Sequence, residues 1–87
     1  SYEESLGSAL VQIFPNPVEQ KLTVKISNLK NRSESLLFIY DMAGKQLYNK
    51  ENLLETNFLN FSKYAKGAYI LRILISGKQK EWVIVKE

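Results

Sequence analysis

The stretch IFPNPVEQKLTVKI, residues 13–26, places two prolines between two apolar, β-rich runs. Pro15 and Pro17 are the only prolines in the chain. Each fixes its own φ at about −65° and has no backbone N–H to donate, and each pushes the preceding residue toward extended geometry. The stretch therefore cannot be helical or run unbroken through the middle of a sheet. We expect a stiff corner that ends one strand and directs the chain into the next.

Length and composition indicate a single small globular domain. The chain has 87 residues, of which 45% are hydrophobic and 24% are charged. No apolar run approaches the ~20 residues of a membrane helix, and no signal peptide is visible. The chain contains neither cysteine nor histidine. This excludes disulfides, thiolate nucleophiles, zinc sites built on those residues and the usual general base near neutral pH.

The charge pattern is mildly basic. The net charge is +3, from 12 basic and 9 acidic residues. Because the lysines are scattered from Lys21 to Lys86 without a dense cluster, we interpret them as solvated sheet faces and edges. Nucleic-acid binding is the minor alternative.

Strand-like runs follow one another at short intervals, with turn signals such as Gly44 and Gly77 between them. The clearest run alternates Leu22, Val24 and Ile26 with polar residues. The predicted strands cover residues 9–14, 21–27, 36–41, 46–50, 56–62, 68–76 and 81–86. This pattern predicts an all-β fold, an Ig-like antiparallel β-sandwich of about seven strands. A helix over residues 52–66, whose apolar spacing partly fits a 3.6-residue period, is the alternative for that segment.

The polar segment SYEESLGS, residues 1–8, is expected to be a flexible linker, and residues 9–87 are expected to form the domain. Period-2 alternation predicts which side chains point between the two sheets. These are Leu22, Val24, Ile26, Leu37, Ile39, Leu47, Leu59, Phe61, Tyr69, Leu71, Ile73, Val83 and Val85.

No catalytic, cofactor or metal site is predicted. The carboxylates form no evident pair on one strand face, and no Ser-x-x-Lys arrangement occurs. Asp41 precedes the turn at residues 42–44 and is expected to accept hydrogen bonds from turn N–H groups. Calcium binding is the alternative, but no second acidic residue lies nearby in the sequence. We therefore expect a protein that is not an enzyme.

Several short motifs occur in a fixed order: PNP at residues 15–17, Tyr-Asp-x-x-Gly-Lys at 40–45, Lys-Gly-x-Tyr at 66–69, and a final β-branched strand ending in lysine. This series resembles the type A C-terminal sorting domain of the type IX secretion system of Bacteroidota, from about residue 9 to residue 87. By this resemblance, the sorting-motif residues are Pro15, Asn16, Pro17, Tyr40, Asp41, Gly44, Lys45, Lys66, Gly67, Tyr69, Leu71, Gly77, Val83, Val85 and Lys86.

The resemblance implies an Ig-like address label at the C-terminus of a cargo protein. The cargo would reach the periplasm by its own signal peptide and cross the outer membrane through a translocon. A sortase-like protease would then remove the label in residues 1–8 or just upstream, leaving the cargo at the cell surface or secreted. No cofactor, nucleic acid or direct membrane insertion is implied. The alternative is a non-catalytic binding or adhesion module, for example a carbohydrate-binding one with Trp82, Tyr40 and Phe38 as an aromatic platform.

The third, sixth and seventh predicted strands should share one sheet, as they do in Ig-like sandwiches. Six of the seven outward positions in these strands are apolar or aromatic, whereas an exposed antiparallel face normally alternates toward polar residues. We expect this face to dock on export machinery or on a second copy, which would give a homodimer. Arg72 is expected to stack on Trp82. The predicted docking face consists of Phe38, Tyr40, Ile70, Arg72, Leu74, Trp82 and Ile84.

Two single features have both a structural and a functional interpretation. The proline corner either holds the first strand at a fixed angle or is itself a recognition epitope, and we favour the structural role. Tyr69 lies near the start of the longest predicted strand, where a tyrosine of an Ig-like sandwich can hydrogen-bond backbone across a corner.

Overall fold

A computed structural model describes all residues from Ser1 to Glu87. It contains eight strands and one short 3-10 helix, η1 (Arg32–Glu34). The strands are β1 (Tyr2–Leu6), β2 (Ala9–Phe14), β3 (Lys21–Ser27), β4 (Ser35–Asp41), β5 (Gln46–Glu51), β6 (Thr56–Asn60), β7 (Gly67–Ile75) and β8 (Lys78–Lys86).

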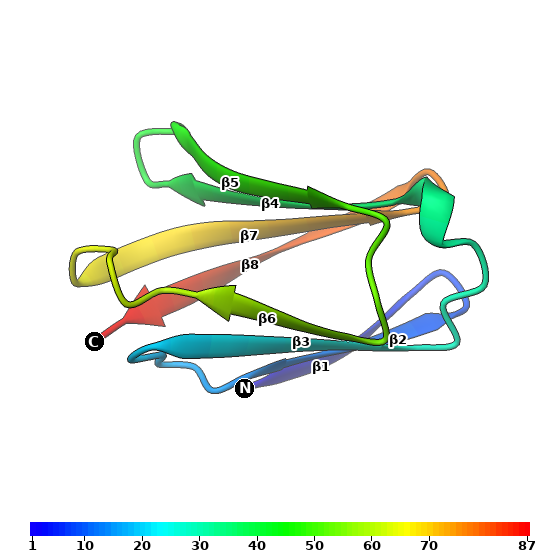
Figure 1. Ribbon diagram of the computed structural model, residues 1–87, viewed down its shortest axis with the longest axis horizontal. Helices are drawn as coiled ribbons and strands as arrows, with labels where there is room; N and C mark the ends of the chain where they lie inside the picture. The colour runs from blue at the N-terminus through cyan, green and yellow to red at the C-terminus, as the bar shows by residue number, and fades with distance from the viewer.

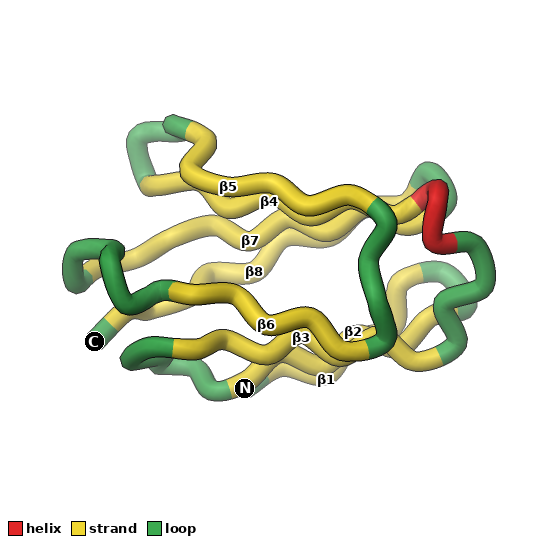
Figure 2. Tube along the Cα trace, in the orientation of Figure 1, coloured by secondary structure: helices red, strands yellow, loops and turns green.

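The strands form two four-stranded antiparallel sheets, in the orders β1-β2-β3-β6 and β5-β4-β7-β8. The sheets stack as two layers with the loops gathered at the two ends (Figure 1, Figure 2). This confirms the predicted Ig-like β-sandwich, including the shared sheet of β4, β7 and β8. The helical alternative for residues 52–66 is wrong, because β6 lies within them and pairs with β3.

The expectation of a flexible linker at residues 1–8 is wrong for most of that segment. Tyr2–Leu6 forms β1 and pairs antiparallel with β2 across a two-residue turn at Gly7 and Ser8. The segment is mostly polar, but its side chains alternate between the two faces of the sheet. Leu6 is buried and Tyr2 packs against the core, while Glu3 and Ser5 face solvent. The domain therefore has eight strands, one more than predicted.

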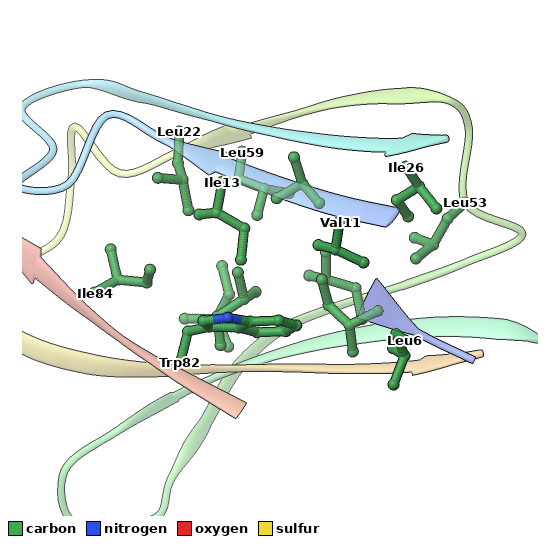
Figure 3. Packing of buried hydrophobic residues seen from close by; sticks show 14 of the residues in the cluster. Leu6, Val11, Ile13, Leu22, Ile26, Leu53, Leu59, Trp82 and Ile84 are labelled. Atoms are coloured by element: carbon green, nitrogen blue, oxygen red, sulfur yellow. The ribbon is translucent and has the colours of Figure 1, made fainter. Parts of the chain in front are cut away.

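Nineteen buried hydrophobic side chains fill the space between the sheets. Ten of the predicted inward residues are among them, from Leu22 in β3 to Ile73 in β7, and Leu47 is half-buried against the cluster. Figure 3 shows Trp82 at the centre of this packing, with Val11, Ile13 and Ile84 around it. The core members that the sequence interpretation did not include are Leu6, Ala9, Val11, Ile13, Val18, Leu53, Ile75, Trp82 and Ile84.

The predicted parity of the last strand is wrong. Val83 and Val85 are 45% and 40% exposed, whereas Trp82 is 4% exposed and Ile84 is fully buried. The tight turn at Ser76 and Gly77 places Ile75 opposite Lys78, and this register puts Trp82 opposite the inward Leu71. Directly opposed residues of an antiparallel pair share a face, so Trp82 must point inward and Val83 outward.

No helical segment of the protein has the length and apolar character that crossing a bilayer requires.

The motif-bearing end and the apolar sheet face

The motif residues lie mostly at one end of the sandwich. The β2–β3 corner, the β4–β5 turn, the β6–β7 connection and the end of β8 all meet there, at the left of Figure 1. The register explains part of this gathering, because Asp41 is opposite Tyr69 and Gly67 is opposite Lys86. Gly77 is the exception, since the β7–β8 turn lies at the other end.

The proline corner is fastened to the free edge of β8. The Asn16 side-chain amide donates to the Val83 carbonyl at 3.0 Å and accepts from the Val85 N–H at 2.9 Å. Just beyond the corner, the Val18 N–H donates to the Val85 carbonyl and the Glu87 N–H donates to the Val18 carbonyl, both at 2.8 Å. The peptide bonds preceding Pro15 and Pro17 are both cis. The predicted stiff corner is thus present, and it also covers an edge strand.

The β4–β5 turn is closed by Asp41. Its carboxylate Oδ1 accepts from the N–H groups of Ala43 and Lys45, both at 2.9 Å. Gly44 follows with φ of +90°, a left-handed conformation that a residue with a Cβ rarely adopts. The predicted local role of Asp41 is confirmed. No group of three or more histidine, cysteine, aspartate or glutamate side chains is arranged to hold a metal ion.

Tyr69 ties the start of β7 to the preceding connection. Its hydroxyl donates to the Ala65 carbonyl at 2.5 Å, which confirms the predicted backbone bond across the corner. Its ring packs edge-on against Phe61, and Tyr64 packs against both rings. Burial raises the pKa of the Tyr64 phenol, with further contributions from the neighbouring Tyr48 and Tyr69. Lys66 is exposed in the connection that precedes β7.

The outer face of the β5-β4-β7-β8 sheet is mainly apolar. Cross-strand pairing places Phe38 opposite Arg72, and Tyr40 and Val83 on either side of Ile70. Six of its apolar members are half-buried, and the two valines of β8 are exposed. We call this surface the apolar face, and it consists of Leu36, Phe38, Tyr40, Ala68, Ile70, Leu74, Val83 and Val85. Compared with the predicted docking face, Trp82 and Ile84 are replaced by Val83 and Val85.

One compensated charge pair lies within the apolar face. The Arg72 guanidinium contacts the Glu81 carboxylate, with Nη2 and Oε2 2.6 Å apart, and this hydrogen bonding raises the pKa of Arg72. The guanidinium also lies 5.0 Å from the centroid of the Tyr40 ring, and Phe38 and Tyr40 stack at 5.9 Å. The expected stacking of Arg72 on Trp82 is therefore wrong. Because Trp82 is buried, the aromatic platform expected for a carbohydrate-binding module does not form.

The first strand makes side-chain contacts with the last strand that the sequence interpretation missed. The Glu4 carboxylate accepts from Lys80 Nζ at 2.9 Å and from the Trp82 indole N–H at 3.1 Å. The Tyr2 hydroxyl donates to the Val83 carbonyl at 3.1 Å. The hydrogen bonds from Lys80 and Trp82 lower the pKa of Glu4. The alternation of Tyr2, Glu4 and Leu6 was the available signal for this strand.

These features define the class of the protein: a small Ig-like β-sandwich domain with its motif residues at one end and one apolar outer sheet face. The sequence pattern of the family described as "Secretion system C-terminal sorting domain" matches residues 12–87. The chain therefore belongs to this family, and it is a C-terminal sorting signal of the type IX secretion system. Such a signal acts on a cargo attached N-terminally, engages the secretion machinery and leads to the cell surface or to secretion. No curated protein matches the chain in sequence.

Proposed function

We propose that the type IX translocon recognises this domain as a folded unit, through the apolar face. The observation that carries this proposal is the composition of that face, on which Arg72 and Glu81 are mutually neutralised and most other central positions are apolar. A contiguous apolar surface on a small domain usually marks a contact site. The occupant is a translocon protein with an apolar surface of low net charge, because a charged partner would find no uncompensated charge at the centre of this face.

The motif-bearing end supports recognition indirectly. Asn16 donates to the Val83 carbonyl and accepts from the Val85 N–H, and these two valines form one margin of the apolar face. Asp41 shapes the turn that follows Tyr40, which also belongs to the face. The motif residues therefore fix the position of the last strand and of the β4–β5 turn, and the domain acts without catalysis.

Processing follows transport. The cargo crosses the periplasm, and a sortase-like protease at the cell surface removes the domain. Proteases of this kind cleave extended, unpaired backbone, whereas β1 is paired with β2 along its whole length. The cleaved bond therefore lies N-terminal to β1, and β1 leaves with the released domain.

A fusion experiment tests both parts of this proposal. Residues 1–87 are attached to a periplasmic reporter in a host that has the type IX system, with the unfused reporter as control. The fused reporter is expected at the cell surface or in the medium, and a periplasmic fusion would contradict the sorting function. Mass spectrometry of the released domain is expected to give an N-terminus at or before Tyr2. A new N-terminus inside β1 or β2 would contradict the proposed cleavage position but not the sorting function.

A further inference from the structure

The two lateral sides of the sandwich differ in how their edge strands are covered. On one side, Glu4 of β1 bonds to side chains of β8, while Tyr2 and the proline corner bond to the outer backbone edge of β8. On the other side, β5 and β6 are the outermost strands of their sheets. No side chain bonds to the outer backbone edge of β6, although an uncovered edge can pair with another strand.

The free groups of β6 follow from its register. Glu55 and Phe61 form backbone hydrogen bonds with Ile26 and Gln20 of the neighbouring segment, both at 2.7 Å. Because bonded and non-bonded pairs alternate in an antiparallel ladder, the backbone groups of Thr56, Phe58 and Asn60 point away from β3. No other backbone or side-chain group of the chain bonds to them.

The β6 edge also lacks the usual protection against pairing. β5 carries a bulge opposite β4 and two charged residues, Lys50 and Glu51, which discourage strand addition. β6 has the sequence TNFLN, without charge, proline or bulge. Phe58 in its middle is 58% exposed.

A pocket adjoins each side of this edge. The pocket on the outer side measures about 360 Å³ and includes Lys21, whose ammonium lies 4.5 Å from the Phe58 ring centroid. The pocket on the inner side, between the two sheets, measures about 220 Å³. It is lined mainly by apolar and aromatic side chains, namely Ile39, Tyr48, Phe58, Leu59, Asn60 and Tyr64.

We infer that the β6 edge binds an extended segment of a partner protein by strand addition, with an apolar side chain in the inner pocket and an acidic side chain beside Lys21. Successive side chains of an added strand alternate between the two sides of the sheet, so neighbouring residues would enter the two pockets in turn. Backbone hydrogen bonds to Thr56, Phe58 and Asn60 would supply affinity, and the pockets would supply specificity. This surface is separate from the apolar face and does not depend on the proposed translocon contact.

A peptide titration tests the inference. The probe is a capped octapeptide in which glutamate alternates with valine, with one central valine replaced by phenylalanine. In ¹⁵N-resolved NMR spectra, we expect saturable amide shifts at Thr56, Phe58 and Asn60, and at Tyr48 across the inner pocket. Shifts confined to the apolar face, or no saturable shift, would overturn the inference. Shifts at the β6 edge that depend on protein concentration without peptide would assign the edge to a second copy and also overturn it.

Two matched comparisons separate strand addition from a non-specific contact. Thr56→Pro removes an N–H that faces away from β3, and an edge strand tolerates such a substitution. It should lower the affinity for the peptide roughly three- to tenfold. Asn49→Pro makes the same change on the outer edge of β5 and should leave affinity unchanged. Lys21→Glu should reverse the preference toward a peptide with lysine in place of glutamate. Equal effects of the two prolines, or an unchanged charge preference, would overturn the inference.

Discussion

The two outer faces of the sandwich have opposite characters. On the β1-β2-β3-β6 sheet, the outward rows are mainly polar, as in the row of Glu3, Gln12, Lys25 and Thr56. On the β5-β4-β7-β8 sheet, the outward rows form the apolar face. An antiparallel sheet with one solvated side should alternate between apolar and polar residues. The absence of alternation in β4, β7 and β8 is the reason for proposing a translocon contact on their outer side.

The largest expected effect tests which side chains of β8 point into the core and which belong to the apolar face. Trp82→Ala removes a side chain from the core and should lower the free energy of unfolding by about 3–5 kcal/mol. Val83→Ala, one residue along, should lower it by less than about 1 kcal/mol. Urea unfolding of the two variants checks this difference. A larger loss of unfolding free energy for Val83→Ala than for Trp82→Ala would mean that Val83 lies in the core and Trp82 at the surface.

The same parity shows how far the sequence could predict the structure. In KLTVKIS, the alternation correctly predicted that Leu22, Val24 and Ile26 point into the core, because polar residues between them indicated the outer side. In EWVIVK, the four consecutive apolar residues do not alternate with polar ones. The inward side chains of this strand could therefore be assigned only from the register set at Ser76 and Gly77. The fold class needed only local patterns, and this prediction is confirmed. The seven predicted strands are all present, with ends that differ from the predicted ones by at most three residues, whereas β1 was not predicted.

The site was predictable in part for the same reason. The local bonds of Asp41 and Tyr69 lie within a few residues and follow from turn chemistry. The bonds of Asn16 and Glu4 to β8 span more than sixty residues of sequence, as shown by separations of 67 and 76. No local pattern specifies such contacts, because they depend on how the two sheets stack.

The next effect concerns the corner that holds one margin of the apolar face. Asn16→Ala removes one acceptor and one donor for β8 and should lower the free energy of unfolding by about 1–3 kcal/mol. It should also increase amide hydrogen exchange at Val85, whose N–H loses its partner. Pro15→Ala, next to it, removes neither hydrogen bond. If the hydrogen-exchange rate of the Val85 amide is unchanged in Asn16→Ala, the proline corner does not hold the last strand.

A smaller effect concerns the attachment of β1, which belongs to the polar sheet but reaches across to β8. The lowered pKa of Glu4 means that its contribution to stability is complete above the ordinary value of 4.5 and is lost as pH falls through the lower, folded-state value. Glu4→Gln should remove this part of the pH dependence and leave the acid unfolding profile shallower below pH 4.5. Thermal midpoints across the acid range check this. An identical profile for Glu4→Gln would show that the carboxylate contacts do not persist in solution.

The smallest effect concerns the ion pair on the apolar face. Arg72 and Glu81 are both partly exposed, with side chains 36% and 45% accessible, so solvent should screen their coupling and make it smaller than the effects above. A double-mutant cycle with Arg72→Met and Glu81→Gln measures it. A coupling energy as large as the loss measured for Asn16→Ala would mean that the face is more strongly desolvated in the free domain than its exposure indicates.

The proposed translocon contact of the apolar face is tested most directly by comparing export after similar apolar losses on and off that face. One reporter fusion carries Phe38→Ser, Ile70→Ser and Val83→Ser. Its matched control carries Leu10→Ser, Phe14→Ser and Leu54→Ser, which are exposed apolar positions elsewhere. Circular dichroism of the isolated domains verifies that both remain folded. We expect the first fusion to be retained in the periplasm while the control is exported at the wild-type rate. Wild-type export of the folded first variant, or an equal loss in both, would contradict the proposed contact.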